Sequence, residues 1–255
     1  MKTFANFENR VAIVTGAGQG MGKKITKTLA ERGATVVACD IDEEKVNESA
    51  KEIEDDSQVY SEVLAAAVDV SDYGEVMEMV DEVRDRYGNI HILVNNAGIL
   101  YPTKIEEVTP EEWQEVIDVN LTGVFNCSRA VYPHMKENGY GKILNNASSA
   151  GRSTSDLGGV HYTASKAGVL GITRHFAKEG GPELNVNAIC PGIINTDMVD
   201  TFGSEEQLQH IRDSLPLKRL GTTEDIADLV AFLVSDESSY ITGETIEIDG
   251  GELMI

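Results

Sequence analysis

Seven short apolar runs, separated by longer amphipathic segments, constrain the fold of this chain more than any other feature. The runs begin at residues 11, 34, 64, 91, 142, 186 and 245 and read VAIV, ATVVAC, LAAAV, HILVNN, KILNNA, VNAIC and TIEI. Most are continuously apolar, which is typical of parallel strands covered on both faces. Helix-like segments lie between them, at 22–32, 43–55, 73–87, 111–136, 162–178 and 224–233. This order predicts an α/β fold, a doubly wound parallel sheet (Rossmann fold) of about seven strands with helices on both faces.

The chain is expected to form one domain, residues 1–255, because this length suits a single α/β core and no linker or composition change divides it. One stretch, 192–222, departs from the alternation and carries scattered apolar residues. A long segment without its own strand is often a binding loop. We therefore expect a substrate loop around residues 193–222, and the alternative is a surface helix packed against the domain.

Composition and charge exclude several kinds of partner. The formal net charge of −22 at pH 7 disfavours nucleic acid and an anionic membrane surface. No stretch of about 18 apolar residues occurs, so no membrane span is expected, and the N-terminal MKTFANFENR has no apolar signal core. The three cysteines lie in apolar surroundings without metal-ligand spacing, which indicates buried reduced thiols, no metal site and a cytoplasmic protein.

A glycine-rich turn follows the first predicted strand. VAIVTGAGQGMGKK places Gly16, Gly20 and Gly22 where the backbone must turn sharply before a helix, and such a turn brings a pyrophosphate to the helix N-terminus. Asp40 ends the second strand about 20 residues further on, where a carboxylate accepts hydrogen bonds from adenosine ribose hydroxyls. The same carboxylate repels a 2′-phosphate, Asp42 adds negative charge, and no lysine or arginine is near enough in sequence to offset it. NAD is therefore predicted in preference to NADP.

The segment YTASK places Tyr162 and Lys166 four residues apart at the start of a predicted helix. Residues with this spacing lie on one helical face, one turn apart. In isolation the pair would be two solvated surface residues, and the glycine-rich turn favours a catalytic role instead. His161, next to Tyr162, is expected at the surface.

Asn120 interrupts an apolar stripe at helical spacing. The stripe consists of Trp113, Val116, Ile117, Val124 and Phe125. A polar side chain on such a stripe should have a hydrogen-bond partner. Read from the residues alone, Asn120 is either a satisfied core asparagine or a functional group.

Together, the glycine-rich turn and YTASK make the sequence similar to the short-chain dehydrogenase/reductase family over essentially the whole chain. TGAGQGMG matches the family's TGxxxGxG loop, NNAG (95–98) the motif closing the fourth strand, and YTASK the YxxxK motif. Asp69-Val70 matches the acidic pair that contacts adenine, and PGIINT (191–196) the segment that holds the nicotinamide carboxamide. NASSAG supplies a serine, and ITGETIEIDGG matches the C-terminal strand.

The resemblance implies two sets of site residues. The catalytic set is Asn120, Ser148, Tyr162 and Lys166. The cofactor set is Gly16, Gln19, Gly20, Met21, Asp40, Ile41, Asp69, Val70, Asn96, Ala97, Gly98, Tyr162, Lys166, Pro191, Gly192, Ile194 and Thr196. The family's SxxG spacing, counted back from Gly151, selects Ser148, whereas the interval counted back from Tyr162 selects Ser149; we take Ser148.

These residues have defined chemical tasks in the family. A free tyrosine has a pKa of about 10, and a nearby ammonium and a positive nicotinamide would lower it, so that Tyr162 exchanges the substrate proton. Lys166 would also hold the nicotinamide ribose. Ser148 would hydrogen-bond the substrate oxygen, and Asn120 would anchor a water that leads protons from Lys166 to solvent.

The resemblance implies an NAD-dependent oxidoreductase that interconverts a secondary alcohol and a ketone. Apolar residues in the 193–222 loop favour a hydrophobic substrate such as a hydroxysteroid. The alternatives are a 3-oxoacyl-thioester reductase, which in this family generally prefers NADPH, and a sugar or polyol dehydrogenase. A catalytically silent dinucleotide sensor is the non-enzyme alternative, and a homotetramer or homodimer is implied.

Overall fold

Seven parallel strands form one sheet in the order β3-β2-β1-β4-β5-β6-β7. The computed structural model describes residues 5–155, 157–196 and 205–254. The strands are β1 (Val11–Thr15), β2 (Thr35–Asp40), β3 (Val63–Ala67), β4 (Ile92–Asn95), β5 (Gly141–Asn146), β6 (Leu184–Pro191) and β7 (Thr245–Ile248). The predicted doubly wound fold is confirmed. Strand order reverses between β1 and β4, the point at which such sheets bind ligands.

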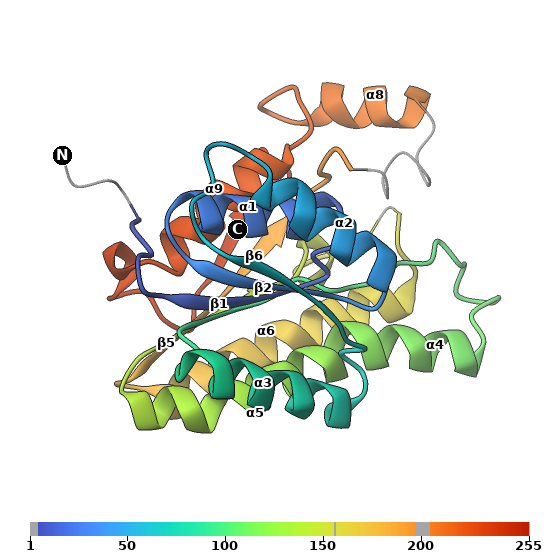
Figure 1. The fold of residues 1–255 in the computed structure, drawn as a ribbon. Helices are drawn as coiled ribbons and strands as arrows, with labels where there is room; N and C mark the ends of the chain where they lie inside the picture. Colours follow the sequence, from blue (N-terminus) through green and yellow to red (C-terminus); the bar gives the residue numbers. More distant parts are fainter. Residues whose placement is uncertain (1–4, 156, 197–204, 255) are drawn as a thin grey trace.

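Helices cover both faces of the sheet (Figure 1). One face carries α1 (Gly20–Glu31), α2 (Glu43–Glu54) and α9 (Thr223–Leu233), and the other carries α3 (Tyr73–Tyr87), α5 (Gly123–Asn138) and α6 (Val160–Gly180). Each layer has its own apolar core, built on one side around Ile25, Leu29 and Val230 and on the other around Val80, Val131 and Met135. Strands buried on both faces explain the continuous apolar runs in the sequence.

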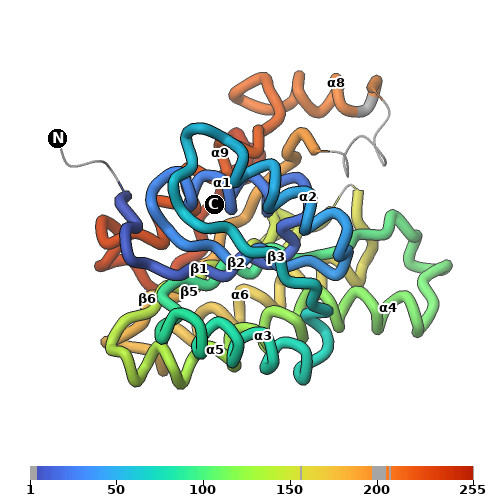
Figure 2. The backbone as a smooth tube through the Cα atoms, viewed as in Figure 1, coloured from blue at the N-terminus to red at the C-terminus, as the bar shows by residue number. Residues whose placement is uncertain are grey.

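The helix predicted at 111–136 is present at residues 110–138 and contains a π-helical turn. Helix α4 (Pro110–Ile117) ends in a π-helical turn, Asp118–Thr122, and α5 begins at Gly123. Figure 2 shows the segment between β4 and α4 running out to one side of the molecule before it returns. The predicted apolar stripe is also only partly core, because Trp113 and Phe125 are 38% and 41% exposed. Turns of the π type inside helices occur most often at functional sites.

The predicted 193–222 loop contains a helix, α8 (Glu205–Ser214), so the packed-helix alternative describes part of it. Leu208, Leu215 and Leu220 form a small buried cluster beneath this helix. The apolar residues Met198, Val199 and Phe202, on which the binding-loop hypothesis also rested, lie outside the described residues. None of the helices in the described ranges is both long and apolar enough to span a membrane.

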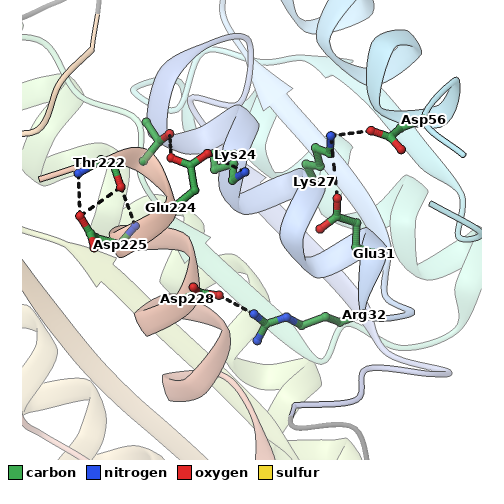
Figure 3. Close-up of polar contacts among 10 residues, drawn as sticks. Lys24, Lys27, Glu31, Arg32, Asp56, Thr222, Glu224, Asp225 and Asp228 are labelled. Atoms are coloured by element: carbon green, nitrogen blue, oxygen red, sulfur yellow. Dashed lines mark hydrogen bonds and ion pairs between the residues drawn. The ribbon is translucent and has the colours of Figure 1, made fainter. Parts of the chain in front are cut away.

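Ion pairs join α1 to α9 across the outer surface (Figure 3). Lys24 pairs with Glu224 at 2.8 Å, and Arg32 pairs with Asp228 at 2.5 Å. Helix α9 begins with a capping box, in which the side chains and backbone N–H groups of Thr222 and Asp225 bond reciprocally. These contacts join α9, which follows the 193–222 segment, to α1, which begins at the glycine-rich turn.

Candidate active site

A cavity of about 500 Å³ opens at the carboxyl ends of the strands. All seventeen residues predicted to bind the cofactor line it, and so does Ser148. Residues outside the two predicted sets also line it: Gly22, Val68, Ile99, Leu100, Glu115, Val119, Asn146, Ala147, Ser149, Ala150, Thr154, Ser155, Leu157, Ile193 and Glu252. Motifs at strand ends predict the residues of one wall because the strand ends converge there, whereas residues such as Leu100, Glu115 and Leu157 come from segments without a comparable motif.

The glycine-rich turn has a geometry that only glycine supports at two positions. Gly16 and Gly20 have positive φ angles of 64° and 56°. A Cβ on Gly22 would lie 2.0 Å from the Gly16 carbonyl oxygen, so the turn packs directly on the first turn of α1. Gln19 precedes this helix without a side-chain cap. The N-terminus of α1 therefore presents amide donors to the cavity, which fits a pyrophosphate.

Asp40 is held rigidly at the end of β2. Its Oδ2 accepts the Gly18 N–H at 2.9 Å and its Oδ1 accepts the Asp42 N–H at 3.1 Å. The prediction that no cation offsets these acids was wrong: Lys45 Nζ lies 3.1 Å from Asp42 Oδ2, because Asp42 caps α2 and Lys45 lies in its first turn. The hydrogen bond to Asp42 raises the pKa of Lys45. Lys45 thus pairs with Asp42, and Asp40 keeps a carboxylate beside the cavity.

Tyr162 and Lys166 extend from the first turns of α6 into the cavity. Lys166 is buried, and its Nζ donates to the Asn146 carbonyl oxygen at 2.8 Å and lies 5.8 Å from the centre of the Tyr162 ring. Burial lowers the pKa of Lys166 from 10.5 to about 8. The buried ammonium therefore loses its proton more readily than that of an exposed lysine.

The pKa of Tyr162 is raised, whereas the sequence predicted a pKa lowered jointly by Lys166 and a positive nicotinamide. Part of its ring faces the cavity, but the side chain is packed deeply enough that desolvation raises its pKa above 10. A hydrogen bond with the Ser148 side chain opposes this rise. Desolvation outweighs any stabilisation of the phenolate by Lys166, whose Nζ lies 5.8 Å from the ring centre and donates to the Asn146 carbonyl oxygen. The contact between Ser148 and Tyr162 supports Ser148 over Ser149, and its catalytic role stays a prediction.

Asn120 lies in the π-helical turn and is fully buried. Its Oδ1 accepts the Ile99 N–H at 2.8 Å, and its Nδ2 donates to the Ile99 carbonyl oxygen at 2.9 Å and to Ser165 Oγ at 3.2 Å. A Cβ on Gly98 would lie 3.2 Å from Asn120 Oδ1 and 3.5 Å from Lys166 Nζ, so Asn120 stands behind the cavity wall near Lys166. The side chain is a satisfied core asparagine, and its water-anchoring role stays a prediction.

His161 is buried, and the expectation of a surface position was wrong. Its Nε2 lies 2.7 Å from Glu112 Oε1, and its Nδ1 accepts the Tyr162 backbone N–H at 2.8 Å. No local pattern indicates this arrangement, because the partner lies 49 residues away in α4. No group of three or more potential metal ligands occurs among the described residues.

Comparison with known proteins identifies the family. A family model described as enoyl-(acyl carrier protein) reductase matches residues 16–252. The chain belongs to the short-chain dehydrogenase/reductase family. It is therefore an oxidoreductase of a family that binds a nicotinamide dinucleotide, and the glycine-rich turn and Asp40 fit that cofactor.

Individual relatives differ in what their names say they act on. The chain is 41% identical to a 3-oxoacyl-[acyl-carrier-protein] reductase of Thermotoga maritima, over 96% of this chain and 98% of the relative. It is 39% identical to a 3α-hydroxysteroid dehydrogenase of Mediterraneibacter gnavus, over 97% and 98%. The crystal structure of a 3-oxoacyl-[acyl-carrier protein] reductase from Brucella melitensis with bound NAD is 35% identical, with a TM-score of 0.89 over 98% of this chain and 94% of that one.

Proposed function

We propose that this short-chain dehydrogenase/reductase interconverts a secondary alcohol and a ketone with NAD(H), on a 3-hydroxyacyl or 3-oxoacyl thioester. The observation that carries the cofactor choice is the Asp40 carboxylate, fixed by two backbone N–H groups beside the cavity. The similarity to the Thermotoga maritima reductase supports the acyl substrate. This substrate replaces the hydroxysteroid as the leading hypothesis.

The preference for NAD follows from charge. A 2′-phosphate at the ribose would lie against Asp40, and the nearest lysine, Lys45, is already paired with Asp42. Like charges at such short range are unfavourable in a partly desolvated site. The bound NAD in the Brucella melitensis reductase supports the use of NAD by a reductase of this kind.

The residues of the chain would divide the chemistry as follows. The cofactor, when bound, supplies the hydride acceptor or donor. Tyr162 would take the alcohol proton during oxidation and return it during reduction, while Ser148 stabilises the charge on the substrate oxygen. Lys166, with its ammonium 2.8 Å from the Asn146 carbonyl oxygen, would hold the cofactor ribose and favour the phenolate form of Tyr162.

The test is turnover of 3-oxoacyl thioesters with NADH and NADPH in parallel, beside panels of hydroxysteroids and polyols. We expect the acyl thioester to turn over with NADH, and Asp40→Ala to reduce the preference for NADH over NADPH by at least about tenfold. Lys45→Ala, which removes the cation but leaves Asp40, is the matched control and should keep the preference for NADH. A wild-type preference for NADPH would refute the Asp40 argument.

A hydroxysteroid substrate is the second candidate, favoured by the charge of the cavity wall. Glu115 and Glu252 line the cavity, and Lys166 is its one lysine or arginine among the described residues. Carboxylates disfavour an anionic substrate, and the apolar Leu100 and Leu157 suit a neutral ring system. The relative named 3α-hydroxysteroid dehydrogenase supports this candidate. Turnover of steroids but of no acyl thioester would establish it.

We also propose that residues 1–255 form one domain that assembles as a homotetramer or homodimer. Trp113 and Phe125, on α4 and α5, are large apolar side chains that are partly exposed. Exposed aromatic groups are enriched at interfaces between proteins. Light scattering coupled to size exclusion should give a mass of two or four times 27.7 kDa, and a monomer would refute the assembly.

A further inference from the structure

The backbone N–H and carbonyl groups of Tyr162 each bond to a side chain of α6, and each of those side chains bonds to a residue of another segment. Its N–H donates to His161 Nδ1 at 2.8 Å, and its carbonyl oxygen accepts from Ser165 Oγ at 2.8 Å. His161 is bonded in turn to Glu112 of α4, and Ser165 to Asn120 of the π-helical turn. The segment that contains α4 and the π-helical turn therefore fixes the peptide groups that flank the tyrosine side chain.

The N–H of Tyr162 needs this partner because the helix does not supply one. Gly159 precedes α6 and has no side chain to cap it, and the first intrahelical bond runs from the Thr163 N–H to the Gly159 carbonyl oxygen. The Tyr162 N–H comes before that bond and belongs to the orphan donors of a helix start. His161 Nδ1 accepts this N–H, as an N-cap side chain does at other helix starts.

The hydrogen bonds define the tautomer of His161 and the charge of Glu112. Nδ1 of His161 accepts, so the ring proton is on Nε2, which donates to Glu112 Oε1 at 2.7 Å. This bond is the main reason that the pKa of Glu112 lies below its usual range, and a second hydrogen bond from Thr103 contributes. Glu112 is thus an anionic acceptor for a fully buried imidazole, which makes a strong, directed contact.

The surrounding backbone is packed to admit the imidazole. A Cβ on Gly159 would lie 2.7 Å from His161 Cε1 and 2.7 Å from the Thr103 carbonyl oxygen. A Cβ on Gly158 would lie 2.8 Å from the Tyr162 ring. Two successive glycines therefore leave room for the histidine and tyrosine rings and for the segment before α4.

We propose that Glu112 and His161 form a positioning pair, which sets the first turn of α6 so that the Tyr162 hydroxyl stays beside Ser148. Neither residue lines the cavity, and the pair acts through the backbone of Tyr162. This inference rests on the proposed catalytic role of Tyr162. A small displacement of a reacting group lowers the rate of a positioned reaction by about 10- to 100-fold.

The test uses Glu112→Ala and Glu112→Gln in the full-length protein, because the Glu112 side chain is partly exposed and its loss leaves the core filled. Glutamine keeps an acceptor oxygen for His161 Nε2–H, and alanine does not. With the substrate and NADH of the turnover assay, we expect Glu112→Ala to lower kcat about 10-fold while the KM for NADH is unchanged. Glu112→Gln should restore most of kcat. His161→Phe should reproduce the alanine variant.

Hydrogen exchange of the Tyr162 amide gives a readout that requires no substrate. We expect faster exchange at this amide in Glu112→Ala and His161→Phe, and unchanged exchange in Glu112→Gln. The matched control is His175→Phe, which breaks the exposed pair of His175 with Glu179 in the same helix and should alter neither readout.

Two results would overturn the proposal: exchange that is the same in Glu112→Ala as in wild type, or faster exchange with an unchanged kcat. If the wild type turned over no substrate, the proposed function would fail, while the exchange measurement would still decide whether the pair holds the Tyr162 backbone.

Discussion

Two regions join distant parts of the chain through different kinds of interaction. One is the surface between α1 and α9, and the other is the set of polar groups along the cavity. Lys24 and Glu224 are paired on the surface, where the glutamate side chain is 60% exposed. Such pairs contribute between 0 and about 1 kcal/mol and are screened by salt. The number of such ion pairs on this acidic protein therefore says little about how firmly α1 and α9 are held together.

Along the cavity, asparagine side chains form a continuous line that ends at Lys166. Asn96 Nδ2 donates to the Gly16 carbonyl oxygen, Asn146 Nδ2 donates to Asn96 Oδ1, and Lys166 Nζ donates to the Asn146 carbonyl oxygen. The line therefore connects the glycine-rich turn to the lysine predicted to be catalytic. A buried donor or acceptor that loses its partner costs more than the bond contributed. The comparison shows that burial, not formal charge, decides which contacts position the site.

The largest effect is expected at Tyr162. Tyr162→Phe removes the proton-exchanging hydroxyl and should lower kcat by about 10³-fold, the usual range for loss of a general acid–base group. NADH binding, followed by the fluorescence of the bound cofactor, should be retained because the ring remains. Tyr60→Phe, at a side chain that is 92% exposed, is the control. Activity within tenfold of wild type would remove Tyr162 from the mechanism.

Lys166 should affect stability in a pH-dependent way. Its pKa is about 8 in the folded protein and 10.5 in the unfolded chain, so the unfolded chain binds this proton more tightly. The buried ammonium therefore destabilises the fold below pH 8, and this effect disappears as the pH rises through 10.5.

Lys166→Met tests this argument by removing the titrating group. The free energy of unfolding of the variant, relative to wild type, should fall by roughly 3 kcal/mol between these two pKa values. Urea unfolding at several pH values measures it, with Lys178→Met, on the exposed side of the same helix, as the control for loss of a lysine. A difference that does not change with pH would contradict the lowered pKa.

Asn145 is a buried polar residue that does not line the cavity, so its substitution tests the contribution of buried hydrogen bonds to stability. It accepts from Asn95 Nδ2 at 2.8 Å and donates to Thr173 Oγ1 at 2.9 Å. Asn145→Leu should lower the free energy of unfolding by about 2 kcal/mol, because it leaves buried polar groups without these partners. Adding Thr173→Val should cost less than the sum of the two single changes, since both remove the same bond. Asn47→Leu, on the exposed face of α2, is the control, and equal losses in the two leucine variants would argue against the role of burial.

The sequence predicted the sheet, the cavity wall formed by the predicted cofactor set, and the placement of Tyr162 and Lys166 on α6, because these depend on local spacing. Parallel strands end at one edge, so motifs that follow strands 1, 2, 4 and 6 meet in space whatever the loops do. The burial of His161 could not be predicted, since it depends on Glu112, and the contact between Lys45 and Asp42 was overlooked although the spacing was visible. The raised pKa of Tyr162 depends on how deeply both groups are packed, which no motif records.

The smallest effect is expected on the surface between α1 and α9. A double-mutant cycle with Lys24→Gln and Glu224→Gln should give a coupling of about 0.5 kcal/mol or less, since the glutamate is mostly exposed. Lys24 lowers the pKa of Glu224 below its usual 4.5, so the coupling is present above that pH and is lost as the pH falls through the lowered value. It should also shrink when salt is raised, because exposed charges are screened. A coupling as large as the loss in Asn145→Leu, unaffected by salt, would mean that exposed charges hold this protein as strongly as its buried amides do, and the distinction between the two regions would fail.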